Sequence, residues 1–255
     1  MKPIFALKTG LLSLILLTLN ACLILLPGKV VTPTGPTTPT TPTGTVVVDN
    51  TKIVDPDNLI VTFKKPSSTT YLTTFGGVAR AAAKTSIADR KTEMMFSVND
   101  VLKSLPTDSY MRKVGVTDKS PRSIDENRNV FISKAYIFSI QKEDDGDFHI
   151  IIGDLVNGEK VNLMTAEIAA LPSDTTSKAY PLLVRSRRQL YEKYPDFFEG
   201  HRAKFVPISN FPMVAIRGSL FFDTHHSAGQ IGSGSVKPQT VWELHPVTYL
   251  EFQDK

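Results

Sequence analysis

The second half of the chain alternates short apolar runs with polar turns, and this pattern predicts most of its secondary structure. Runs rich in aromatic and β-branched residues are typical of strands. An Asp-Gly pair between two such runs, here Asp145-Gly146, is typical of a hairpin because Gly tolerates positive φ. The pattern predicts strands at Val130–Gln141, Phe148–Ile152, Lys160–Ile168, Met213–Phe222 and Val241–Phe252, and one helix at Pro181–Tyr194. On the helix, Arg185, Arg187 and Arg188 are expected to lie largely outside the apolar stripe.

Residues 46–127 predict a less regular, mixed α/β region. Val46–Val48 and Leu59–Phe63 suit short strands, and the Ala-rich Val78–Ala88 has helical propensity. Ser97 is a suitable N-cap for a helix over Val98–Leu105, which Pro106 would end. Basic residues outnumber acidic ones between residues 80 and 128, and we expect that excess to lie on a solvated surface. The predicted boundary with the regular part of the chain is at residues 127/128.

The first residues predict an export signal. Lys2 and Lys8 precede an apolar run, as in a secretory signal peptide. The run ends in Leu19-Asn20-Ala21-Cys22, which resembles the bacterial lipobox and contains the only cysteine of the chain. The resemblance implies that residues 1–21 are a lipoprotein signal peptide and that Cys22 is lipidated, with palmitate-type acyl chains anchoring the protein to a membrane. The alternative is an uncleaved anchor over residues 10–26, which the polar Ser13, Thr18 and Asn20 disfavour.

Residues 22–45 predict a tether that places the following domain in the cell envelope. The segment includes the run TPTGPTTPTTPTGT, which has no charge and no large side chain and therefore cannot form a core. Repeated prolines favour an extended chain. Leu23, and not Asp, follows the cysteine. By analogy with the sorting rule of Gram-negative bacteria, this implies the outer membrane if the source is such a bacterium.

Composition and charge limit the classes of ligand. The chain is 41% hydrophobic and 21% charged, as globular proteins are. Lys2, Lys8 and Lys29 precede the predicted folded part, which therefore has 26 of the 29 basic residues and all 25 acidic residues, so that its net charge is close to zero. Bulk charge therefore gives no support to nucleic-acid binding, and only a local basic patch could attract a polyanion.

The predicted order of three strands, a helix and two strands is that of the OB-fold, a five-stranded Greek-key barrel with one helix. The stretches KEDDGDFHIIIGD (142–154), RGSLFFD (217–223) and TVWELHPV (240–247) resemble bacterial OB-fold envelope proteins of the nucleic-acid-binding type. The resemblance covers about half of the chain. It implies a mainly β domain after a mixed α/β region, and a non-catalytic binding module. A glycan- or protein-binding envelope adaptor is the alternative.

Strand alternation singles out the candidate ligand-binding residues. In the last strand, Trp242 and Leu244 are expected to face the core, whereas Glu243 and His245 are expected to share the opposite face. Four aromatic residues could stack on bases, although aromatic residues in a small barrel usually form the core: Tyr136, Phe138, Phe148 and Trp242. The predicted ligand-binding set is Tyr136, His149, Arg217, Glu243 and His245.

Two further hypotheses involve a divalent metal. Asp223, His225 or His226, and His245 carry suitable ligands, and the alternative for these residues is a hydrogen-bonded network that fixes the long loop over Asp223–Gln239. Asp147 and Asp154 could match carboxylates of staphylococcal-type nucleases, which are OB-folds too. The arginine expected near Ile152 is absent, however, and no other catalytic motif was found. We therefore expect no enzyme, with a degenerate metal-dependent phosphodiesterase as the remaining alternative.

Overall fold

The computed structural model describes residues 80–198 and 202–253. The predicted signal peptide, Cys22, the tether and the two strands expected before residue 64 lie outside the described residues. Within the described residues, no helix is both long enough and apolar enough to cross a membrane.

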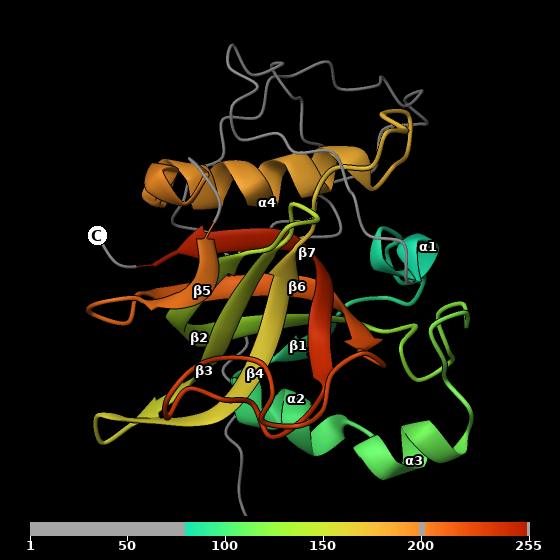
Figure 1. Cartoon of the computed structure of the whole chain (residues 1–255), viewed down its shortest axis with the longest axis horizontal. Coiled ribbons are helices and arrows are strands. Elements are labelled where there is room, and N and C mark those ends of the chain that lie inside the picture. Colours follow the sequence, from blue (N-terminus) through green and yellow to red (C-terminus); the bar gives the residue numbers. More distant parts are fainter. Residues whose placement is uncertain (1–79, 199–201, 254–255) are drawn as a thin grey trace, which may run out of the picture. The chain divides into compact units, whose positions relative to one another are not determined.

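The described chain is mainly β, and its strands form one mixed sheet of seven strands (Figure 1). Five of them close a ring in the order β2-β3-β4-β7-β6, because β6 also pairs with β2. All pairings in the ring are antiparallel except that of β4 with β7, which is parallel. The strands are β1 (Glu93–Met95), β2 (Asn129–Lys142), β3 (Phe148–Val156), β4 (Glu159–Ile168), β5 (Arg202–Pro207), β6 (Met213–Phe222) and β7 (Trp242–Phe252).

Within residues 80–198 and 202–253, four α-helices and one short 3-10 helix accompany the sheet. The helix α4 lies against β7, whereas α2 contacts β2, β3 and β4 at the other end of the sheet (Figure 1). As the sequence predicted, Ser97 caps α2, and its side chain and that of Asp100 form a capping box. The helices are α1 (Ala81–Lys84), α2 (Val98–Ser104), α3 (Asp108–Lys113), α4 (Tyr180–Lys193) and the 3-10 helix η2 (Pro195–Phe197).

Alternation along the strands builds the main core inside the ring. Alternate residues over Phe148–Ile152 of β3, Met164–Ile168 of β4 and much of β6 belong to one buried cluster, and β7 adds Trp242, Leu244, Val247 and Leu250 to it. The residues between them point to the outer face. A second cluster around Phe138, Ile151 and Val236, with Phe205 and Phe211 packed against it, covers part of that face.

The structure corrects two sequence-based expectations and adds a contact that the sequence did not predict. The contact joins residues 80–127 to the following strands, because β1 pairs with β2 and both Val98 and Val101 belong to the main core. Arg187 is fully buried, and its guanidinium donates to the carbonyl oxygens of Gly146 and Ala169, 3.0 Å away in each case. The basic excess before residue 128 is partly internal as well, since Arg80 is only 6% exposed.

Candidate functional site

Acidic and histidine side chains converge on the outer face of three neighbouring strands. In the antiparallel pair β3–β4, His149 lies opposite Glu167. In the parallel pair β4–β7, Thr165 lies opposite Glu243, so that His245 comes beside Glu167. Asp147 reaches the same place from the hairpin before β3. We call Asp147, His149, Glu167, Glu243 and His245 the buried polar cluster; each is at most 6% exposed.

Glu167 is the centre of the buried polar cluster. Its Oε1 lies 2.6 Å from His149 Nε2, and its Oε2 lies 2.7 Å from His245 Nε2 and 3.7 Å from Lys84 Nζ. His245 Nε2 also lies 3.3 Å from Asp147 Oδ2. One carboxylate therefore bridges two imidazoles, and a second carboxylate shares one of them.

The surrounding structure holds these side chains in place. The other oxygen of Asp147 accepts a hydrogen bond from Ala170 N at 2.6 Å. The centroid of the Phe221 ring lies 5.5 Å from that of the His245 ring. The guanidinium of Arg80 in turn lies over the Phe221 ring, 4.5 Å from its centroid. Such rigid support is typical of residues that must keep a fixed geometry.

Charges within the cluster oppose the effect of burial. Burial alone would raise the pKa of Glu167, but the charges of His149, Lys84 and His245 hold it well below the ordinary range. Burial and the charge of Glu167 raise the pKa of Glu243 well above the usual value of a glutamate. Burial alone would lower the pKa of His149, yet Glu167 raises it to about 9. Without a further ligand, His149 is therefore charged at neutral pH, and the raised pKa of Glu243 favours its neutral form.

The cluster also holds polar atoms without a hydrogen-bond partner. Among the described residues, seven buried side-chain atoms lack one, and four of the seven belong to this cluster: His149 Nδ1, Glu167 Oε2, Glu243 Oε1 and His245 Nδ1. Buried polar groups are normally satisfied, because an unmade hydrogen bond costs about 1–3 kcal/mol. Two of the four have a charged neighbour nonetheless, because Glu167 Oε2 lies near His245 and Lys84, and His149 Nδ1 lies 3.4 Å from Glu143 Oε1. Glu243 Oε1 and His245 Nδ1 therefore keep hydrogen-bonding capacity that the described neighbours do not use.

The predicted ligand-binding residues do not share an exposed face. His149, Glu243 and His245 belong to the buried polar cluster. Arg217 is buried too, and its Nε donates to Thr248 Oγ1 at 3.0 Å. Tyr136 is only partly buried, with Lys134 Nζ 5.8 Å from its ring. Of the other aromatic candidates, Phe138, Phe148 and Trp242 are at most 1% exposed and belong to the hydrophobic clusters.

The residues of the predicted metal site divide between two places. Asp223 and His226 form an ion pair, and His225 lies on the surface with its Nε2 3.6 Å from Asp118 Oδ2. His245 lies with Asp147 and Glu167 instead. The ring of His226 approaches the cluster through His149, with 6.4 Å between the ring centroids.

Asp154, the second carboxylate of the nuclease hypothesis, belongs to β3, and its side chain contacts the N-terminus of α2. Its two oxygens accept hydrogen bonds from Val98 N and Asn99 N, each at 3.0 Å, and Asn162 Nδ2 donates to it at 2.8 Å. Asp154 therefore binds the free N–H groups of a helix end.

Two residues that contribute to the cluster around His245, Glu167 and Lys84, were not predicted from the sequence.

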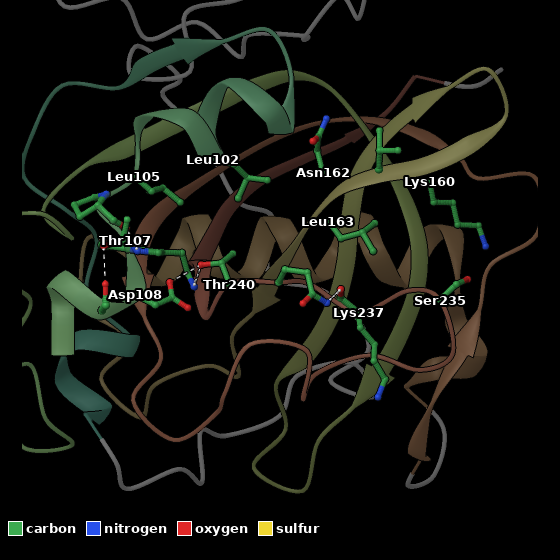
Figure 2. A pocket seen from close by; sticks show the side chains of 15 residues that line it. Leu102, Leu105, Thr107, Asp108, Lys160, Asn162, Leu163, Ser235, Lys237 and Thr240 are labelled. Carbon is green, nitrogen blue, oxygen red and sulfur yellow. Dashed lines mark hydrogen bonds between the residues drawn. The ribbon is translucent and has the colours of Figure 1, made fainter.

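A separate cleft of about 920 Å³ lies between α2, α3, the start of β4 and the β6–β7 loop (Figure 2). Figure 2 shows Leu102 and Leu105 next to each other at one end of the cleft, and Leu163 of β4 adds a third apolar side chain to the lining. Polar side chains come from β4 and the loop, among them Lys160 and Lys237. The single acidic lining residue, Asp108, accepts hydrogen bonds from Thr240 Oγ1 at 2.8 Å and from Val241 N at 3.2 Å.

Comparisons of this chain with models of protein families, with curated proteins and with solved structures found no match.

Proposed function

We propose that this protein is a non-catalytic binding module that takes a short segment of single-stranded nucleic acid in the cleft of Figure 2. The observation that carries the proposal is the pair of cations in this cleft. Lys160 and Lys237 come from different elements, and both oxygens of the nearby Asp108 are occupied by Thr240 and Val241. The cleft thus offers two cations to phosphate groups beside an apolar wall for bases.

The order of the ring supports an OB-type fold for this module. Its third and fourth strands, β4 and β6, are separated by the helix α4, and its fourth and fifth strands are joined by the long loop before β7. OB-folds bind oligonucleotides and oligosaccharides on their second and third strands and on adjoining loops. The cleft is lined by the third strand and by the loop between the fourth and fifth, which agrees with that position.

The position of the carboxylates supports binding without catalysis. Asp154 is engaged by the N-terminus of α2, and Asp147 is buried beside His245. Neither residue lines the cleft. Because a catalytic acid, base or metal ligand must reach the scissile phosphodiester, these two carboxylates do not suit cleavage of a polymer bound there.

The lipobox resemblance at Cys22 supports an envelope location, with residues 22–45 as the tether. We propose a lipid anchor, in the outer membrane if the source is Gram-negative. Because Asn162, Gln239 and Thr240 line the same cleft, an acidic glycan is the alternative ligand that the test must separate from nucleic acid.

The test uses the intrinsic fluorescence of Trp242, the single tryptophan of the chain, which lines the cleft and donates from its indole to Pro106 O at 2.9 Å. Oligothymidylates of about 4 to 16 nucleotides are titrated into the purified chain over a series of salt concentrations. We expect saturable binding whose salt slope falls by about 1.4 in the double variant Lys160→Gln/Lys237→Gln, at about 0.7 per phosphate contact in a single strand.

Lys178 supplies a matched control, because it is exposed in the turn before α4 and does not line the cleft. Lys178→Gln should leave both affinity and salt slope unchanged. If the double variant binds oligothymidylate like the wild type, the cleft is not the binding site. Binding of an acidic oligosaccharide, without binding of the oligonucleotide, would replace the ligand in the proposal.

A further inference from the structure

We propose that Asp147, Glu167 and His245 form a buried structural site for one divalent transition-metal ion, best matched by Zn²⁺. Their ligand atoms lie within 4.8 Å of one another, and among the described residues no other group of three His, Cys, Asp or Glu side chains meets this condition. None of the three lines the cleft, so the inference goes beyond the proposed function and does not depend on it.

The spacing of the three ligand atoms is close to what a bound ion requires. His245 Nε2 lies 2.7 Å from Glu167 Oε2 and 3.3 Å from Asp147 Oδ2. Bonds of 2.0–2.2 Å to a tetrahedral Zn²⁺ place neighbouring ligand atoms roughly 3.3–3.6 Å apart. Shifts of less than about 1 Å would therefore admit the ion, with the three donors coming from the hairpin before β3 and from β4 and β7.

The free oxygen of Glu243 is a second observation. Glu243 is buried in the same cluster and contacts Glu167, and its Oε1 has no hydrogen-bond partner. Glu167 Oε2, in contrast, lies 2.7 Å from His245 Nε2 and 3.7 Å from Lys84 Nζ. Because an unsatisfied buried acceptor is costly, an ion bound beside Glu167 would give the free oxygen of Glu243 a partner.

The neighbours of the three residues suit a metal centre. His149 Nε2 contacts Glu167 Oε1 at 2.6 Å and fixes the orientation of that carboxylate, as the outer partners of metal ligands do. Glu243 contacts Glu167 as well, and its buried Oε1 has no hydrogen-bond partner. It can supply a fourth oxygen.

The donor types favour zinc over the common hard cations. Zn²⁺ accepts both imidazole nitrogen and carboxylate oxygen as ligands, whereas hard cations prefer oxygen ligands alone. Ca²⁺ takes 6–8 oxygen ligands, and Mg²⁺ usually keeps several waters. The three side chains are at most 2% exposed, which suits the closed, four-coordinate sites that stabilise folds. Binding would replace the proton on His245 Nε2, because only the neutral imidazole ligates.

The competing explanation is an ion-pair network in which Lys84 supplies the positive charge. Lys84 Nζ lies 3.7 Å from Glu167 Oε2 and comes from α1. In that case the cluster binds no ion, and its stability comes from side-chain charges alone. The two explanations differ in one measurable quantity, the metal content of the folded protein.

The experiment refolds the untagged chain from denaturant and chelator with Zn²⁺ or Co²⁺, removes free metal by dialysis, and measures bound metal by mass spectrometry. We expect one ion per chain, a visible absorption band of ligated Co²⁺, and a higher Tm with metal than without. Glu167→Gln and Asp147→Asn should lose the ion and the band. Asp223→Asn, which alters the separate pair with His226, should keep both.

Wild-type protein that folds in Zn²⁺ or Co²⁺ yet carries no ion above the chelated sample would overturn the proposal, even if a variant fails to fold. Loss of the ion in Asp223→Asn with retention in Glu167→Gln would overturn it as well. Far-UV circular dichroism reports folding in each case. The lysine variants of the cleft should keep the metal, so this inference and the proposed function can fail separately.

Discussion

The ion pair between Arg80 and Glu126 joins the segment before α1 to the sheet, and its loss is a sharp test of the structure. Arg80 Nη1 donates to Glu126 Oε1 at 2.9 Å, and Nη2 donates to Oε2 at 3.0 Å. The two side chains are 1% and 0% exposed. Glu126 also accepts from Phe222 N at 2.9 Å and from Ser123 N at 2.6 Å. The perturbation is Glu126→Gln, which keeps the shape and removes the charge.

The magnitude follows from what the substitution leaves behind. Breaking a buried ion pair costs about 3–5 kcal/mol because one charge stays unpaired. Arg80 keeps hydrogen bonds to the carbonyl oxygens of Ser120, Pro121 and Phe222, which favours the lower end. The glutamine retains one oxygen, so one of the two backbone N–H groups loses its acceptor, at about 1 kcal/mol. We expect a total destabilisation of about 4 kcal/mol.

The assay is urea unfolding followed by far-UV circular dichroism. With an m-value of about 2 kcal/mol/M, the midpoint should fall by about 2 M. The exposed pair Arg188–Glu192 is the control, because its atoms are 2.7 Å apart while its side chains are 52% and 51% exposed. Glu192→Gln should cost less than about 0.5 kcal/mol. Equal effects of the two substitutions would refute the reasoning that burial decides the strength of these pairs.

Two further predictions concern the sheet and its buried polar cluster. The first is measured on metal-free protein kept with a chelator. The contribution of His149 to stability is complete below about pH 6.5 and is lost as the pH rises through its pKa of about 9. The urea midpoint of the wild type should therefore fall over this pH range, and that of His149→Gln should fall less. The second concerns Gly153, where an added Cβ would lie 2.7 Å from Val161 O and 3.0 Å from the Phe138 ring. Gly153→Ala should therefore lower the free energy of unfolding by about 1–3 kcal/mol. An unchanged urea midpoint would contradict the close approach of β3 to β4.

Elements with a strong local pattern could be predicted from the sequence. The range Met213–Phe222 coincides with β6, and the predicted starts of β4 and β7 differ from the observed ones by one residue. The Asp-Gly hairpin is present, and Gly146 has a φ of 90°. These segments combine period-two alternation with clear turn residues, so their local preference and their final environment agree.

Short elements that depend on tertiary pairing were not predicted. β1 has three residues and β5 has six, and each pairs with β2. In the described part of the predicted helix Val78–Ala88, which begins at Arg80, only the four residues of α1 are helical, and Arg80 before them has a left-handed backbone with φ 48°. Local propensity favours a longer helix there, but the contacts of the Arg80 guanidinium with residues far along the chain fix a different path.

The candidate site likewise contains residues that a local pattern could predict and residues that depend on tertiary pairing. Glu243 and His245 could be assigned to one face from alternation alone. Their approach to Glu167 depends on the parallel register of β4 with β7, which joins residues about 80 positions apart and leaves no local trace. Glu167 did carry a signal, because it is a lone carboxylate among the apolar residues at the end of a predicted strand. Arg187 likewise follows Leu183 by one turn, on the apolar stripe of its helix.

The buried arginines change what the charge of the chain implies for its ligand. Arg80 and Arg187 are buried and donate mainly to backbone carbonyl oxygens inside the protein, so these two cations cannot meet a polyanion. Nucleic-acid binding would then rest on Lys160 and Lys237. With two phosphate contacts, a fourfold rise in salt should weaken binding only about sevenfold. A much steeper salt dependence would require more cations than the cleft contains, and would place the contacts on another part of the chain.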